Sequence, residues 1–139
     1  MTSQVDISKL IKFTNTYNLL YVEDNKEARD SMLGLLSNFF TRITVANDGI
    51  DGLQKFNIDK FNLILTDIHM PNMNGSEMIT KIREINKDIY IVVLSAYNYS
   101  DNNLNFNTNI VDDFLVKPID MNHLINALMK IYKKEILNV

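Results

Sequence analysis

The sequence predicts an α/β fold, a doubly wound five-stranded parallel sheet with helices on both faces. Two observations predict it. Short apolar runs of strand length alternate about five times with segments whose apolar residues recur at helical spacing. The runs are apolar throughout, as in strands that are buried on both faces of a parallel sheet. Because parallel strands need crossover helices of one hand, this alternation places helices on both faces of the sheet.

The composition is that of one globular domain. Of the 139 residues, 46% are hydrophobic and 22% are charged, which is ordinary for a soluble domain. The formal net charge is -3 and no Lys/Arg cluster occurs, so no direct nucleic-acid partner is expected. The absence of cysteine excludes disulfides and thiolate metal sites. No apolar run approaches the ~18 residues that cross a bilayer, so we expect no membrane partner and, by default, a cytoplasmic location.

Residues 1–16 precede the first strand and are interpreted as an N-terminal extension, separate from a main domain at 17–139. The apolar residues of this extension fit a short amphipathic helix or an arm that packs on the domain; they are Val5, Ile7, Leu10, Ile11 and Phe13. A disordered leader is an equal alternative, and no function is assigned to the segment.

The five predicted strands are compact apolar runs bounded by turn-forming residues. They cover residues 19–22, 43–46, 63–65, 90–94 and 114–116. The fourth run is the most β-prone segment of the chain because it is rich in β-branched residues. A loop rich in Pro, Asn and Gly follows the third run, so that strand ends sharply.

Four helices are predicted from apolar residues at helical spacing. The first three carry, in order, Ala28, Met32, Leu35, Leu36 and Phe39; Leu53 and Phe56; and Met78, Ile79, Ile82 and Ile85. The last carries Leu124, Ile125, Leu128, Met129, Tyr132 and Ile136. Ser76 and Asp120 are expected to be the N-caps of the third and last of these helices. Residues 98–109 are polar and rich in asparagine, so the sequence gives little support to a further helix before the fifth strand.

Polar side chains follow four of the predicted strands. The first strand ends in Glu23 and Asp24, the third in Asp67, the fourth in Ser95 and the fifth in Lys117. In an open α/β sheet, ligands and chemistry collect beyond the carboxyl ends of the strands. We therefore expect these five side chains to meet at one edge of the sheet. Each residue alone has an ordinary alternative, such as a capping aspartate or a surface lysine.

The residue types at this edge predict a phosphoryl-accepting site. Three carboxylates gathered together repel one another unless a cation intervenes, and hard oxygen ligands suit Mg²⁺. A backbone carbonyl just after Asp67 would add a further oxygen ligand. Lys117 offers a compact positive charge and Ser95 a hydroxyl. An aspartate beside a metal ion and a lysine can attack a phosphoryl group and carry it as an aspartyl phosphate.

The sequence resembles the receiver domain of two-component response regulators. The motifs that carry the resemblance are Glu23-Asp24, Asp67 with Met70-Pro71 and Gly75 downstream, Ser95-Ala96, and Phe114-Leu115-Val116-Lys117-Pro118. The resemblance implies a flavodoxin-like (CheY-like) fold and a receiver domain at residues 17–139. It also implies Mg²⁺-dependent phosphorylation of Asp67 by a sensor histidine kinase or a histidine phosphotransfer protein. Such a domain is a phosphoacceptor for signalling and not an enzyme, beyond its own phosphorylation and slow autodephosphorylation.

The resemblance also implies roles for single residues. Asp24, Asp67 and the backbone carbonyl of His69 would hold Mg²⁺, with Glu23 acting partly through water. Ser95 and Phe114 would form the switch pair, in which the hydroxyl moves to the phosphoryl group and the ring turns inward behind it. The bond between Lys117 and Pro118 would be cis.

Two residues at the mouth of the expected site are candidates for tuning it. His69 and Tyr97 each lie two residues beyond a site residue. Their bulk would limit the approach of water and so set the lifetime of an aspartyl phosphate. The alternative is that both are exposed loop side chains.

The sequence departs from the family pattern before the fifth strand. Gly-Ala is usual there, whereas this chain has Ile110-Val111. A glycine would permit the left-handed backbone that ends the fourth helix of the family. The fourth helix, fifth strand and fifth helix form the family's usual dimerising face. The partners that the resemblance implies also include a downstream output domain or target protein and, through that face, a second copy of the chain in a homodimer.

Three other functions compete with phosphoryl acceptance. A flavin carrier of the same fold needs a phosphate-cradling loop after the first strand, where Glu23 and Asp24 would repel phosphate. A phosphatase with an aspartate nucleophile needs a second acid two residues on, where His69 lies. A degenerate receiver, acting only as a protein-protein docking module without phosphorylation, is the remaining alternative.

Overall fold

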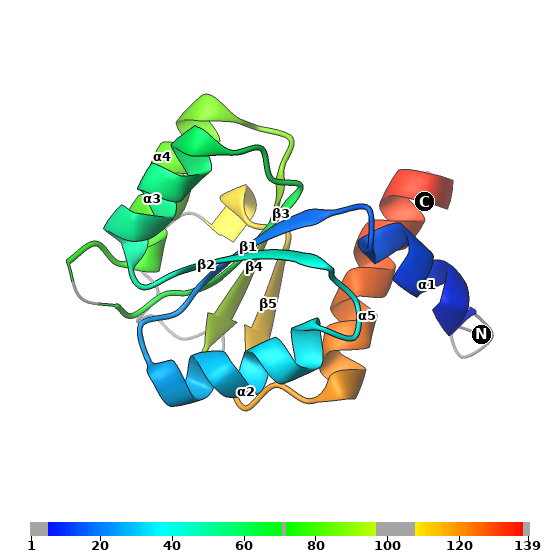
Figure 1. Cartoon of the computed structure of the whole chain (residues 1–139). Coiled ribbons are helices and arrows are strands. Elements are labelled where there is room, and N and C mark those ends of the chain that lie inside the picture. The colour runs from blue at the N-terminus through cyan, green and yellow to red at the C-terminus, as the bar shows by residue number, and fades with distance from the viewer. Residues whose placement is uncertain (1–5, 71, 97–107, 138–139) are drawn as a thin grey trace.

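The computed structural model describes residues 6–70, 72–96 and 108–137. Its centre is a parallel five-stranded sheet in the order β2-β1-β3-β4-β5 (Figure 1). The strands are β1 (Asn18–Val22), β2 (Arg42–Ala46), β3 (Leu63–Asp67), β4 (Tyr90–Ser95) and β5 (Asp113–Val116). This is the flavodoxin-like strand order, so the predicted fold class is confirmed.

Helices cover both faces of the sheet. They are α1 (Ile7–Thr14), α2 (Lys26–Leu36), α3 (Gly49–Ile58), α4 (Gly75–Ile85) and α5 (Met121–Tyr132), with a 3₁₀ turn at Thr108–Ile110 and a π-helical turn at Lys133–Leu137. Figure 1 shows α3 and α4 on one side of the sheet, and α2 and α5 on the other. Each side has its own apolar core, because the central strands present buried residues to both faces.

The helices begin at polar side chains that accept hydrogen bonds from the first turn. Asn25, Asp48 and Asp120 each accept a backbone N–H three residues on, so the prediction for Asp120 is confirmed. The prediction for Ser76 is wrong. Asn74 is the N-cap of α4, because its extended backbone lets its Oδ1 accept the N–H of Glu77 at 2.9 Å.

Two predicted core positions are exposed. The buried stripe of α4 ends at Ile82, and Ile85, the last residue of that helix, is 62% exposed. Ile136 is 54% exposed because the chain beyond Tyr132 winds as a π-helix. That wider turn takes later residues out of the 3.6-residue stripe of α5.

The N-terminal helix packs against α5. The rings of Phe13 and Tyr132 are 5.3 Å apart and Leu10 is fully buried. The buried hydroxyl of Thr14 donates to the carbonyl of Phe39 at 2.7 Å, which attaches α1 to the chain after α2. The division into an extension at 1–16 and a domain at 17–139 stays a prediction.

The segment before β5 falls largely outside the described residues. Most of the stretch 98–109, for which the sequence gives little support to a helix, is in this part, and only the turn at Thr108–Ile110 is described. At Ile110 the guanidinium of Arg83 donates to the carbonyl at 2.7 Å and also reaches the carbonyl of Ile89 at 2.6 Å. Within the described ranges, no helix is long and apolar enough to cross a bilayer.

Candidate functional site

The five predicted site residues lie at one edge of the sheet. Glu23 and Asp24 directly follow β1, Asp67 ends β3, Ser95 ends β4 and Lys117 follows β5. The register confirms that these strand ends are neighbours, since Asp67 is opposite Leu94 and Ser95 is opposite Val116. Parallel strands therefore bring together side chains that are up to 94 positions apart in the chain.

Three carboxylates form the acidic part of the site. One oxygen each from Glu23, Asp24 and Asp67 lies within 4.8 Å of the others. Glu23 is 1% exposed and Asp67 8% exposed, whereas Asp24 is open to solvent. Hard anionic oxygens in a partly open cluster fit Mg²⁺, which takes few protein ligands and retains water.

Lys117 connects two of these acids. Its Nζ atom lies 2.8 Å from Oε1 of Glu23 and 3.3 Å from Oδ2 of Asp67. Its backbone N–H donates to the carbonyl of Ser95 at 2.7 Å, which fixes the start of the loop after β5. The peptide bond to Pro118 is cis, as the resemblance implies.

The charges of the site shift two pKa values. Burial by itself lowers the pKa of Lys117, but hydrogen bonds and charge attraction from Glu23 and Asp67 outweigh burial and raise the pKa above its usual value. Lys117 therefore stays cationic. Burial, followed by the hydrogen bond and the charge of Glu23, raises the pKa of Asp24, although Lys117 opposes this. The acidic cluster is thus incompletely neutralised by its lysine.

The loop after β3 holds Asp67 in place. The N–H of Ile68 donates to Oδ1 of Asp67 at 2.8 Å, and the N–H of Gly75 donates to the carbonyl of Ile68 at 2.7 Å. A Cβ on Gly75 would lie 2.2 Å from the carbonyl oxygen of Asp67. Only glycine permits this close approach, so the glycine of the predicted motif has a structural role that the sequence did not reveal.

A second loop braces this one. Asn72 has a left-handed backbone with φ 68°, and its Nδ2 donates to Oδ2 of Asp48 at 2.7 Å. Next to this contact, the N–H of Gly49 donates to the carbonyl of Met73 at 3.0 Å. Sequence reasoning missed this brace. The Asn-Asp-Gly signal at 47–49 predicts a turn but not the loop that the turn contacts.

The remaining predicted residues lie around the cluster. Ser95 is 1% exposed. Phe114, opposite Val93 of β4, is half-buried and packs against the core beneath α3 and α4. His69 is an exposed residue of the loop after Asp67. Tyr97 lies outside the described residues.

Comparison with known proteins agrees with this geometry. The family model described as the response regulator receiver domain matches residues 19–129. The transcriptional regulatory protein ZraR of Klebsiella oxytoca is 30% identical over 107 residues, which are 77% of this chain and 24% of that protein. The hybrid signal transduction histidine kinase D of Dictyostelium discoideum is 32% identical over 115 residues, 81% of this chain and 7% of that protein. The chain thus spans a quarter or less of the length of these two relatives.

Solved structures share the fold of this chain. The response regulator protein TrrA of Thermotoga maritima, in complex with Mg(2+)-BeF, has a TM-score of 0.71 and 28% sequence identity, covering 81% of this chain and 96% of that one. A CheY-like receiver domain protein of Methanospirillum hungatei has a TM-score of 0.76 at 24% identity, covering 88% and 98%, and supports the fold. The fold, the order of the site residues and the family match together show that this chain belongs to the response regulator receiver domain family.

Proposed function

We propose that Asp67 accepts a phosphoryl group from the phosphohistidine of a sensor histidine kinase or a histidine phosphotransfer protein. The observation that supports this most directly is the position of Asp67, with Lys117 Nζ 3.3 Å from its Oδ2 and the acid pair of the first turn beside it. The aspartate oxygen attacks phosphorus, the phosphorus–nitrogen bond breaks, and the imidazole leaves with the electron pair of that bond.

The neighbouring groups neutralise the charge of the transferred group. Lys117 faces the oxygens of Asp67 and supplies one positive charge. Glu23, Asp24, Asp67 and the backbone carbonyl of His69 are the proposed ligands of Mg²⁺, which would supply the remaining positive charge when bound. Both oxygens of Glu23 already have partners, Lys117 and the N–H of Asn25, which fits a ligand that acts partly through water.

The proposed response is a change of the signalling surface. Ser95 ends β4 at the site, and Phe114 lies on β5, the strand next to β4. In this proposal the Ser95 hydroxyl moves to the phosphoryl group and the Phe114 ring turns inward behind it. The bulk of His69, and of Tyr97 two residues beyond Ser95, slows the attack of water on the aspartyl phosphate.

The domain acts in signalling and has no external substrate in this proposal; it promotes only its own phosphorylation and slow autodephosphorylation. Its partners are the phosphodonor protein and a downstream output domain or target protein. A homodimer would use the face that includes β5 and α5. We place the protein in the cytoplasm, where such phosphodonors act.

The test is phosphorylation by a small donor. The protein is incubated with acetyl phosphate and Mg²⁺, and intact mass is measured. One phosphoryl group is expected on the wild type and none on Asp67→Asn. Asp30→Asn is the matched control, since it removes an exposed acid of α2 that pairs with exposed Lys26. No mass gain, or a gain that survives Asp67→Asn, would favour a docking module instead.

A further inference from the structure

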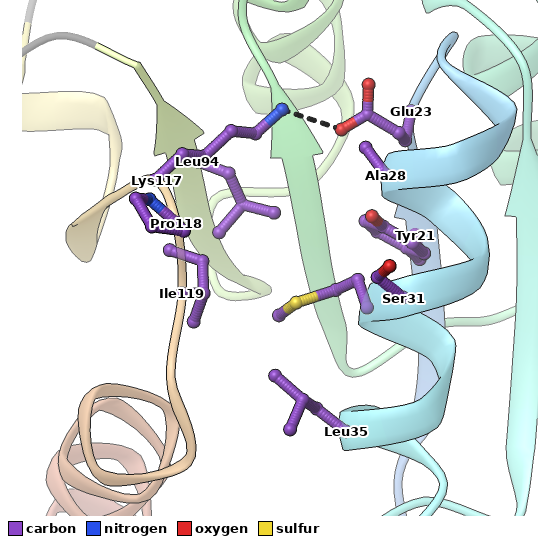
Figure 2. A pocket seen from close by; sticks show the side chains of 10 residues that line it. Tyr21, Glu23, Ala28, Ser31, Leu35, Leu94, Lys117, Pro118 and Ile119 are labelled. Atoms are coloured by element: carbon purple, nitrogen blue, oxygen red, sulfur yellow. Dashed lines mark hydrogen bonds and ion pairs between the residues drawn. The ribbon is translucent and has the colours of Figure 1, made fainter.

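A cavity of about 360 Å³ lies beside the proposed phosphorylation site. One wall is α2, which contributes Ala28, Ser31 and Leu35, and the opposite wall contains Pro118 and Ile119 (Figure 2). Figure 2 shows these walls facing each other across an open space. Ligand pockets in proteins start at roughly 300 Å³, and an apolar cavity of about 150 Å³ already binds benzene. The volume is therefore sufficient for a two-ring aromatic molecule.

A tyrosine side chain supplies a hydrogen-bonding group to the cavity. Tyr21 is 1% exposed as a residue and lines the cavity, and its hydroxyl makes no hydrogen bond to another described residue. It can donate one hydrogen bond and accept another. An apolar occupant with a single hydrogen-bonding group would satisfy it.

The charged residues of the cavity neutralise each other. Glu23 and Lys117 form an ion pair of 2.8 Å at one end of the cavity, and the dashed line in Figure 2 marks this pair. The remaining lining is mainly aliphatic, including Leu35 and Leu94. A charged ligand would therefore find no unpaired countercharge, which favours an uncharged one.

We infer that this cavity is a binding site for a small uncharged aromatic molecule that carries one hydrogen-bonding group for Tyr21. The ligand packs between α2 and the Pro118-Ile119 segment, under the Glu23–Lys117 pair. The inference concerns a site separate from Asp67, and binding to it requires neither phosphorylation nor Mg²⁺.

Coupling to the site at Asp67 is a second consequence, and it rests on the proposed function. The Lys117 stem lines the cavity, and its ammonium pairs with Glu23. A phosphoryl group on Asp67 competes with Glu23 for that ammonium. A ligand that packs beneath Lys117 while its ammonium is bound to Glu23 therefore disfavours the phosphorylated state. By reciprocity, phosphorylation weakens binding of the ligand.

The probe is indole, which has two rings and one N–H donor, and the matched control ligand is benzothiophene, which has the same shape without the donor. Binding is followed by methyl NMR of the full chain, using Met32, which lines the cavity, among its seven methionines. For indole we expect saturable shifts of the Met32 methyl with Kd on the order of 1 mM. Tyr21→Phe should weaken indole roughly 3- to 10-fold and leave benzothiophene unchanged.

Two further measurements separate the outcomes. Ala28→Leu fills the cavity and leaves residue Tyr21 unchanged. It should abolish binding of both ligands while the protein stays folded. Adding Mg²⁺ and beryllofluoride to the wild type should weaken indole at least 2-fold. Absence of Met32 shifts with either ligand, or equal loss of both ligands in Tyr21→Phe, overturns the site. If beryllofluoride does not weaken indole binding, only the coupling is overturned. Phosphorylation of Asp67 is tested independently by the intact-mass measurement.

Discussion

Lys117 is ion-paired with Glu23, and the two atoms that form the pair, Nζ and Oε1, are 2.8 Å apart. The Glu23 side chain is 1% exposed, so its charge has little solvent to stabilise it. The same ammonium is 3.3 Å from Asp67. Lys117 thus has two tasks, to stabilise a buried acid and to face the proposed phosphoacceptor, and substitution can separate them.

Lys117→Met keeps the aliphatic stem and removes the charge. It should lower the free energy of unfolding by about 1–3 kcal/mol, because Glu23 is left buried without its cation. Adding Glu23→Gln in the same chain should restore most of that loss, while phosphorylation of Asp67 stays strongly slowed in both variants. Urea unfolding and phosphorylation rates measure the two effects. Equal stability of the single and double variants would show that Glu23 costs the fold nothing when it is left without its cation.

Gly75→Ala tests the close approach of two backbone segments. The new Cβ would lie 2.2 Å from the carbonyl oxygen of Asp67, so the loop must move and the unfolding free energy should fall by about 2–4 kcal/mol. Phosphorylation should fall with it because the loop positions Asp67.

Gly34→Ala is the control for that substitution. A Cβ there meets nothing within 4 Å, and Gly34 lies inside α2. Alanine should therefore stabilise the protein by about 0.5–1 kcal/mol. If both glycine substitutions changed stability alike, helix propensity rather than the contact with Asp67 would explain the result.

Asp24→Asn should make the protein less dependent on metal. The pKa of Asp24 is raised by burial and by Glu23, so its charged form is disfavoured, and removing the charge should leave stability unchanged or raise it by less than about 1 kcal/mol. The wild type should gain stability as Mg²⁺ is added, whereas the variant should gain much less. Thermal unfolding with EDTA or Mg²⁺ gives both values. A variant that gains as much as the wild type would exclude Asp24 as a ligand.

The same shift predicts how metal binding depends on pH. The folded-state pKa of Asp24 lies above the ordinary value of 3.8. The stability due to its proton is fully present below 3.8 and is lost as the pH rises through the folded-state pKa. Because Mg²⁺ requires the carboxylate, Mg²⁺ affinity should increase over that interval and then level off. Titration calorimetry at a series of pH values tests this, with Asp24→Asn expected to lose the pH-dependent step.

Much of this architecture could be predicted from the sequence because it depends on local patterns. Apolar runs such as 90–94 define strands, and parallel strands must align their carboxyl ends, so the sequence alone predicts that Asp67 and Lys117 lie together. Ser76 was wrong as N-cap because Asn74 lies close by with an equally suitable side chain, and only the backbone angles decide between them. The exposure of Ile136 depends on a π-helical turn that its apolar spacing does not signal.

Contacts between loops could not be predicted from local sequence patterns. Asn72 and Asp48 are 24 positions apart, and neither belongs to a motif that names the other. The cavity beside Tyr21 likewise depends on how α2 and the Pro118-Ile119 segment are spaced. Such features arise from packing between elements and become visible only once the sheet is assembled.

The brace between Asp48 and Asn72 can be divided into a backbone and a side-chain part. Asn72 is left-handed at φ 68°, a conformation that asparagine tolerates and alanine does not. Its amide donates to Oδ2 of Asp48, whose Oδ1 caps α3 through the N–H of Asp51. Asn72→Gly keeps the backbone conformation and loses the hydrogen bond, whereas Asn72→Ala loses both. The free energy of unfolding should therefore be about 1–2 kcal/mol lower for the alanine variant than for the glycine variant.

The glycine variant then isolates what the hydrogen bond does for the site. The loop it braces begins at Asp67 and carries the backbone carbonyl of His69, a proposed Mg²⁺ ligand. A looser loop must be ordered when the metal binds. Asn72→Gly should therefore weaken Mg²⁺ binding more than its small effect on the free energy of unfolding suggests. Asn38→Gly controls for the entropy of an added glycine, because Asn38 is exposed, follows α2 and is far from Asn72 in the sequence. If the two glycine variants bound Mg²⁺ equally well, the brace would support the fold without shaping the metal site.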